Sequence, residues 1–137
     1  MVLQYKDKFP DGVAVYDIER GKLADIREHY WQTDTSVSYK SWGYVESDEF
    51  KSVTTIVHDL VDIVSKNGNL LLNVPPKADG TFDDETIRIL QEIGAWNRVN
   101  GEAIFHTRPW ISFGEGDVRF TRSKDQKSLY ILLLTWP

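Results

Sequence analysis

The stretch that most constrains the fold is NLLLNVPP, residues 69–76, which lies between two segments with helical periodicity. Leucines and a valine dominate the run before the prolines, and they do not alternate regularly with polar residues. Strands of this kind are typical of parallel sheets that helices cover on both faces. The proline pair ends the strand, since proline has no N–H to donate to a ladder. We therefore expect a strand over residues 69–74 that is buried on both faces.

An amphipathic helix is predicted before this strand, over residues 50–66. Its apolar residues recur at spacings of three and four, which places them on one face of a helix. Ser47 or Asp48 is expected to cap its start. Asn67-Gly68 is expected to end it in a left-handed turn.

A second helix is predicted after the strand, over residues 84–99. Asp83 is its expected N-cap, and the acidic residues that follow suit the positive end of the helix dipole. Asn100-Gly101 is expected to end it. Its inner face is expected to consist of Ile87, Leu90, Ile93 and either Trp96 or Asn97.

The flanking segments differ from this central part. Residues 13–16 follow a Pro-Asp-Gly turn signal and are predicted to form a short buried strand. Residues 22–46 show no lasting period and are expected to form a loop, whose aromatic content favours a functional role over disorder. Residues 118–121 and 129–136 flank a polar turn over 123–127, which predicts a β-hairpin that begins a separate all-β unit. Alternating strands and helices are typical of a parallel sheet or (β/α) barrel, but these are too few to close a barrel.

Composition excludes several classes of function. Without cysteine, the 137-residue chain has no disulfide, thiolate metal site or cysteine nucleophile. Its net charge is −5 and its basic residues are scattered, so we expect no nucleic-acid partner. No apolar run is long enough to cross a bilayer, and the charged N-terminal segment does not resemble a signal peptide, so no membrane partner is expected. The 12% aromatic content fits a large core or a surface that stacks on sugar rings.

Polar and aromatic residues gather where the predicted strands end. Working residues in βα folds lie at the carboxyl ends of strands, which makes Asp17, Glu19 and Asn73 candidates. The aromatic loop supplies a third group of candidates, Trp31, Asp34, Trp42 and Tyr44.

Each candidate also has a purely structural interpretation. Glu19 beside Arg20 would be a solvated charge pair, Asn73 would cap the turn into the prolines, and the loop aromatics would belong to the core. The three histidines are far apart and lack ligand spacing, so no metal site is expected. His58 and the nearby Asp62 are expected on a solvent-exposed helix face. The chain contains no glycine-rich phosphate loop and no nucleophile elbow.

Four motifs follow one another over residues 12–110: YDIERG, YWQTDTSVSYKSWGY, LVDIVSKNGNLLLNVPPKADGTF and EIGAWNRVNGEAIFHTRPW. In this order they resemble the family 29 glycoside hydrolases, the α-L-fucosidases. The final DVRFTRSKDQKSLYILLLTWP is similar to the start of that family's C-terminal β-sandwich. The resemblance implies an α/β fold in which residues 1–110 are the last βα units of a partial (β/α)8 TIM-like barrel. Residues 111–137 would then be a β-hairpin of the β-sandwich domain.

The resemblance also implies an activity, the retaining cleavage of terminal α-L-fucose from fucosylated glycans or glycosides. The family uses an Asp nucleophile and a Glu acid/base, and it needs no metal or organic cofactor. Glu19 in DIERG matches the acid/base position, and Trp42 in SWGY matches an aromatic residue that touches the fucose ring. Trp31 matches a family tryptophan near the site. Asn73 matches the asparagine of LLLN, for which we expect a structural or supporting role.

Two departures from the family pattern stand out. Pro75 occupies a position where glycine or serine is usual, and its fixed φ is expected to alter the rim of the site. The nucleophile belongs to a strand upstream of residue 1, so we expect a fragment that lacks it. A free-standing chain of this kind is expected to form homo-oligomers or pair with a complementing fragment, because exposed sheet edges recruit other chains. The alternative is a non-catalytic truncated module that self-associates or binds sugar weakly through Trp31 and Trp42.

Overall fold

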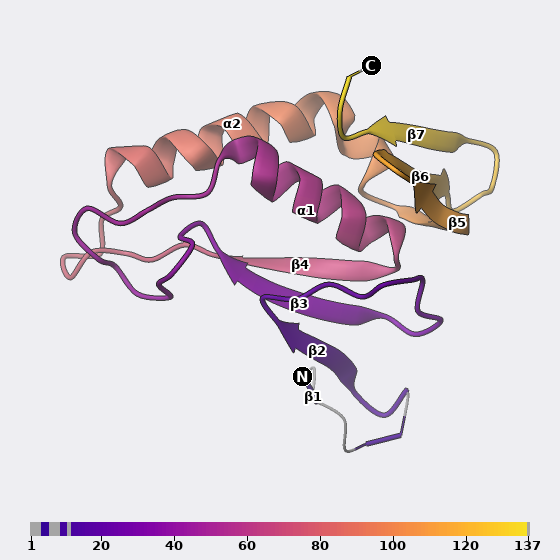
Figure 1. Ribbon diagram of the computed structural model, residues 1–137, viewed down its shortest axis with the longest axis horizontal. Coiled ribbons are helices and arrows are strands. Elements are labelled where there is room, and N and C mark those ends of the chain that lie inside the picture. Colours follow the sequence, from indigo (N-terminus) through magenta and orange to yellow (C-terminus); the bar gives the residue numbers. More distant parts are fainter. Residues whose placement is uncertain (1–3, 6–8, 11, 137) are drawn as a thin grey trace.

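The computed structural model describes residues 4–5, 9–10 and 12–136 and shows a mixed α/β fold (Figure 1). Two helices lie on one side of a four-stranded parallel sheet, and a three-stranded antiparallel sheet follows. In chain order the elements are β1 (Gln4–Tyr5), β2 (Val15–Glu19), β3 (Trp31–Ser36), α1 (Val53–Ser65), β4 (Gly68–Asn73), α2 (Asp84–Asn100), the 3₁₀ turn η1 (Gly101–Ala103), β5 (Thr107–Glu115), β6 (Val118–Ser123) and β7 (Leu129–Leu133).

The strands of the parallel sheet follow the order β1-β2-β3-β4. α1 connects β3 to β4 and packs on the sheet, while α2 lies on the same side (Figure 1). No helix among the described residues covers the other face of the sheet. The carboxyl ends of β2, β3 and β4 lie together at one end of the sheet. The candidate site lies at this strand-end edge.

The two helices confirm the predictions made from periodicity. α1 begins later than expected, because Ser52 caps it and accepts from the backbone N–H of Thr55 at 3.0 Å, so neither Ser47 nor Asp48 is the cap. Its expected left-handed end is confirmed, since Asn67 has φ 70°. Asp83 caps α2 as predicted.

The predicted inner face of α2 is confirmed for Ile93 and Trp96, which pack against the two buried clusters, but was wrong for Ile87 and Leu90. Thr86 and Ile89 are fully buried, whereas Ile87 is 40% exposed and Leu90 is 36% exposed. Ile89 packs with Val37 and Ile56, on the segment after β3 and on α1. The sequence pattern missed this because α2 has apolar residues on more than one face, so contacts with other elements decided which were buried.

The expectation of an unstructured loop over residues 22–46 was wrong for β3. This strand buries Trp31, Thr33 and Thr35 on alternate positions, toward the helices. Its period of two was hidden because two of these inward residues are threonines, which hydropathy does not distinguish from surface residues. β2 also differs from its prediction, since it starts at Val15 and continues through the charged residues to Glu19.

β4 is confirmed as a strand but is not buried on both faces. Leu72 packs against the core formed by Val37, Ile56 and Ile89. Leu71, on the opposite face, is 54% exposed. The apolar residues of β4 are therefore packed against the core on one face only, and on the opposite face Leu71 is exposed.

The predicted hairpin is confirmed as β6 and β7, and it is joined by β5, which was not predicted. This sheet packs on α1 through Val57 and Val61, with Leu132 and Leu134 contributing from the last strand and its continuation. β5 lies across residue 110, where the boundary between two domains was expected. The division into residues 1–110 and 111–137 stays a prediction.

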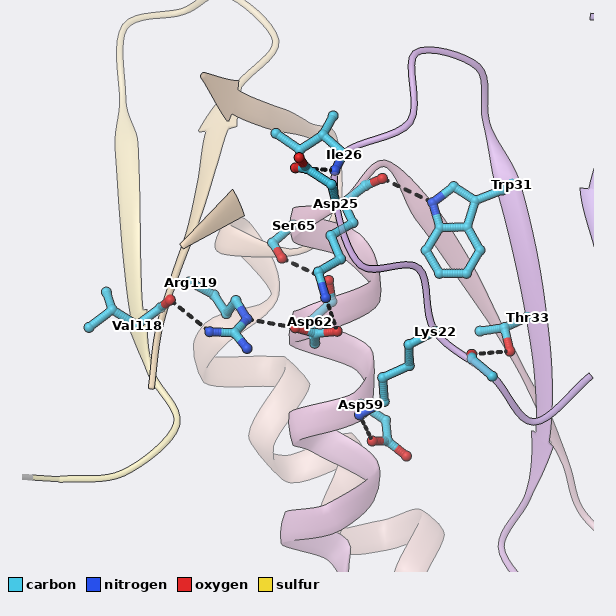
Figure 2. Close-up of polar contacts among 12 residues, drawn as sticks. Lys22, Asp25, Ile26, Trp31, Thr33, Asp59, Asp62, Ser65, Val118 and Arg119 are labelled. Carbon is cyan, nitrogen blue, oxygen red and sulfur yellow. Dashed lines mark hydrogen bonds and ion pairs between the residues drawn. The ribbon is translucent and has the colours of Figure 1, made fainter. Parts of the chain in front are cut away.

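A buried ion network links α1 to this antiparallel sheet. Asp62 accepts from Lys66 Nζ at 2.8 Å and from Arg119 Nε at 2.6 Å (Figure 2). The side chains of Asp62 and Lys66 are 7% and 8% exposed. The expectation that Asp62 lies on a solvent-exposed face was therefore wrong, because the second sheet covers that face of the helix. Within the described part of the chain, no helix has the length and apolar character needed to cross a membrane.

Candidate functional site

Four residues from three strands share the edge of the parallel sheet where the strands end. Glu19 lies in register with Asp34, and Ser36 lies in register with Asn73. Side chains in register point to the same face of a sheet, and side chains alternate along each strand. These four side chains therefore lie on the face opposite the helices.

Asn73 holds the loop that leaves β3. Its Nδ2 donates to the backbone oxygen of Trp42 at 2.8 Å and to Ser36 Oγ at 3.2 Å. Its own backbone oxygen accepts from Val37 N at 3.1 Å. Asn73 thus joins the ends of β3 and β4 to the aromatic loop. Its role therefore goes beyond the alternative in which it only caps the turn into the prolines.

Arg20 holds the same loop from the end of β2. Its guanidinium donates to the backbone oxygens of Tyr39 at 2.7 Å and Ser41 at 3.1 Å, and more weakly to that of Ser38 at 3.4 Å. Its Cζ atom lies 4.1 Å from the ring centroid of Trp42. These contacts do not fit the alternative in which Arg20 only forms a solvated charge pair with Glu19, because the guanidinium is directed toward the loop.

The side chains that could meet a ligand differ in exposure. Glu19 is exposed, and Trp42 is 36% exposed. Asp34 is half-buried, and its Oδ1 has no hydrogen-bond partner among the residues that the structure describes. Two carboxyl groups from neighbouring strands thus share this end of the sheet with the loop that carries Trp42.

Two predicted candidates lie away from this edge. Asp17 is in the middle of β2, where its Oδ1 accepts from Gln32 Nε2 at 3.3 Å. The other is Trp31. It lies at the opposite end of β3, is fully buried on the helix side, and donates its indole N–H to the backbone oxygen of Lys66 at 2.9 Å (Figure 2). Gly68 leaves room for its ring, since a Cβ there would lie 2.5 Å from it. A tryptophan motif alone does not indicate which face of a strand the ring occupies.

Lys51 also stabilises the start of this loop through hydrogen bonds. Its backbone N–H donates to the oxygen of Val37 at 2.8 Å, and its Nζ donates to Thr35 Oγ1. Burial, the largest effect, lowers the pKa of this amine below its ordinary value. Sequence reasoning singled out neither Lys51 nor the loop-holding role of Arg20, because both depend on contacts between distant segments.

The described residues contain no group of three or more His, Asp or Glu side chains placed to hold a metal ion. The family model for α-L-fucosidase matches residues 4–102. The chain belongs to the α-L-fucosidase family.

Individual α-L-fucosidases agree with this assignment. Plasma α-L-fucosidase of Homo sapiens is 35% identical over 125 residues, which are 87% of this chain and 27% of the human protein. Tissue α-L-fucosidase of Bos taurus is 38% identical over 115 residues, which are 82% of this chain and 24% of the bovine protein. The chain thus spans about a quarter of the length of these fucosidases.

Solved fucosidase structures share the fold. One α-L-fucosidase superposes with a TM-score of 0.80 at 34% identity, over 88% of this chain and 29% of that one. Thermotoga maritima α-fucosidase in complex with a mechanism-based inhibitor gives 0.78 at 33% identity, with the same coverage. The similarity therefore includes most of this chain, helices and strands together.

Proposed function

We propose that this chain forms the closing part of the catalytic (β/α)8 barrel of a retaining α-L-fucosidase, followed by the first strands of its C-terminal β-sandwich. The substrate class is a glycan or glycoside that ends in α-L-fucose. The observation that carries the proposal is that Glu19 ends β2 at the same sheet edge where Asn73 and Arg20 hold Trp42. Active sites of such barrels lie at the carboxyl ends of their strands.

Glu19 is the proposed general acid and base. It would protonate the glycosidic oxygen as the bond to the leaving group breaks, and then accept a proton from the water that hydrolyses the fucosyl-enzyme. Trp42 would pack its ring against the C–H face and the methyl group of fucose. The aspartate nucleophile would come from a segment that precedes this chain in the complete enzyme. Neither proton transfer nor attack by a carboxylate requires a metal or organic cofactor.

A graft tests this assignment. The chain would replace the matching segment of Thermotoga maritima α-fucosidase, which supplies the remaining barrel, and hydrolysis of an unactivated alkyl fucoside would be measured. We expect turnover that falls by about a hundredfold or more in Glu19→Gln, the usual scale of a lost general acid. Glu28→Gln is the matched control, because Glu28 is exposed and lies away from the carboxyl ends of the strands. Equal turnover in Glu19→Gln and the parent graft would remove Glu19 from the role.

Asp34 offers a way to test whether the chain alone lacks a nucleophile. It lies in register with Glu19, and the two carboxyl groups of a retaining pair are about 5–5.5 Å apart. We expect no hydrolysis of an aryl fucoside by the isolated chain. Hydrolysis that Asp34→Asn abolishes would show that the chain carries both carboxyl groups and would overturn the expected incompleteness.

The alternative function is a non-catalytic module that self-associates and binds sugar weakly. The partial exposure of Trp42, 36%, favours it for the isolated chain. Fucose-dependent quenching of tryptophan fluorescence without turnover, lost in Trp42→Phe, would support this alternative. Trp31 is not part of the proposed contact, because its ring is fully buried.

A further inference from the structure

The loop that carries Trp42 is fixed from two sides. Arg20 reaches the backbone oxygens of Tyr39 and Ser41 from β2, while Asn73 reaches that of Trp42 from β4. A guanidinium has a planar set of donors, so it can bind two carbonyls and stack on a ring at once. An ammonium group has the charge but not this geometry.

Arg20 also covers one face of the Trp42 ring. Its Cζ atom lies over that ring at 4.1 Å from the centroid, within the usual range of a cation–π contact. Trp42 nevertheless remains 36% exposed. Since the guanidinium occupies one face, a sugar ring would stack on the other.

The backbone of Arg20 adds an independent sign of a constrained position. Its φ is 50°, in the left-handed region that residues other than glycine rarely adopt. Its N–H donates to the oxygen of Asp34 at 2.9 Å, which holds this conformation at the end of β2. Unfavourable backbone conformations persist where the surrounding contacts enforce them, and they cluster at functional sites. Here the turn directs the side chain to the loop.

We propose that Arg20 is a positioning residue for fucose recognition: it fixes the Trp42 loop and covers one ring face, so that Trp42 presents the opposite face to the sugar. The proposal rests on the proposed function for the identity of the sugar, but the contact between Arg20 and Trp42 is a property of this chain. Arg20 thus acts through Trp42 and has no step in the chemistry. The geometry of its loop and ring contacts requires arginine, and lysine would restore only part of the effect.

The first experiment uses the full 137-residue chain and observes its tryptophan indole N–H groups by ¹⁵N NMR, with Trp42 assigned from Trp42→Phe. We expect Arg20→Met to shift or broaden the Trp42 resonance and to leave that of Trp31 unchanged. Trp31 is the internal control for folding, because its N–H is bonded to Lys66. Arg98→Met, on the exposed side of α2, should change neither. An unchanged Trp42 resonance in Arg20→Met would overturn the proposal.

A second variant, Arg20→Lys, covers the case in which Arg20→Met disturbs the fold. If the Trp31 resonance also moves in Arg20→Met, Arg20→Lys decides by the same criterion. The lysine variant should alter Trp42 while leaving Trp31 in place. A Trp42 resonance identical to that of the parent chain would then count against the proposal.

The second experiment uses the graft described above. Arg20→Met should raise KM for an aryl fucoside by roughly tenfold, in line with the loss of one stacked contact, and should change kcat by less than about threefold. Combined with Trp42→Ala, it should add nothing to the effect of Trp42→Ala alone, because both changes remove the same contact. Added guanidinium ion should restore part of the lost KM effect in Arg20→Met.

The two experiments separate the possible failures. Independent, multiplicative effects of Arg20→Met and Trp42→Ala on KM would overturn the positioning role even if the graft is active. A graft without activity would count against the proposed function, and the NMR result would still decide whether Arg20 positions Trp42.

Discussion

Asp62→Asn is the most informative test of how the two sheets are joined. The substitution keeps the size of the side chain but removes the charge that both Lys66 and Arg119 bind, at 2.8 and 2.6 Å. Removing one partner of a buried ion pair costs about 3–5 kcal/mol, because the other charge is left uncompensated. Arg119 is 14% exposed and keeps its bonds to the oxygens of Gly116 and Val118. We therefore expect the lower end of that range, about 3 kcal/mol.

Urea denaturation of the full chain measures this cost. With a slope of about 1.5–2 kcal/mol per molar, the transition midpoint should fall by about 1.5–2 M. Asp59→Asn is the matched control on the same helix, since Asp59 pairs with Lys22, whose side chain is 45% exposed. That pair should contribute less than about 1 kcal/mol. Equal, small shifts for both variants would refute the buried network and, with it, the packing of the antiparallel sheet on α1.

Three further predictions follow from other contacts. Gly68→Ala should destabilise the chain by about 2 kcal/mol, because the added methyl would lie 2.5 Å from the Trp31 ring; Gly43→Ala, with nothing within 4 Å, should be near neutral, and equal denaturation midpoints would contradict this. Burial raises the pKa of Asp62, but its bonds to Lys66 and Arg119 outweigh this and leave the pKa below the ordinary 3.8. The contribution of the Asp62 charge to the free energy of unfolding is therefore present above about pH 4 and is lost as the pH falls through the lowered pKa. Asp62→Asn should accordingly flatten the loss of stability between pH 5 and pH 2 (about the range in which a lowered carboxyl titrates), and an unchanged acid slope would argue against it. Finally, β4 and β1 are edge strands in the described part of the sheet, so the isolated chain should self-associate at micromolar concentration, whereas a single monomer boundary in sedimentation velocity would contradict that expectation.

The predictable part of the fold was the part with a clear hydrophobic pattern. α1 follows from its apolar spacing and β4 from its continuous apolar run. Their limits differ from the expected ones by a few residues, since caps such as Ser52 depend on local geometry. β3 could not be found in this way, because threonines fill its inward positions. Asp62 was misplaced for a related reason: its two cations come from the next turn and from β6, and the second of these is distant in sequence.

The candidate site was predictable in its position more than in its construction. The strand-end rule and the family motifs led to Glu19, Trp42 and Asn73, which the structure places at one edge. The same motifs suggested Trp31, whose ring points to the core instead. The contacts of Arg20 with the Trp42 loop span about twenty residues of sequence and depend on a left-handed backbone turn, which no periodicity reveals.

The dependence of rate on leaving group in the grafted enzyme tests the central claim most directly. If Glu19 protonates the departing oxygen, Glu19→Gln should slow cleavage of alkyl fucosides far more than cleavage of fucosides whose leaving group is a weakly basic phenolate, which departs without a proton. An equal loss of rate for both classes, or none for either, would show that this sheet edge does not supply the acid.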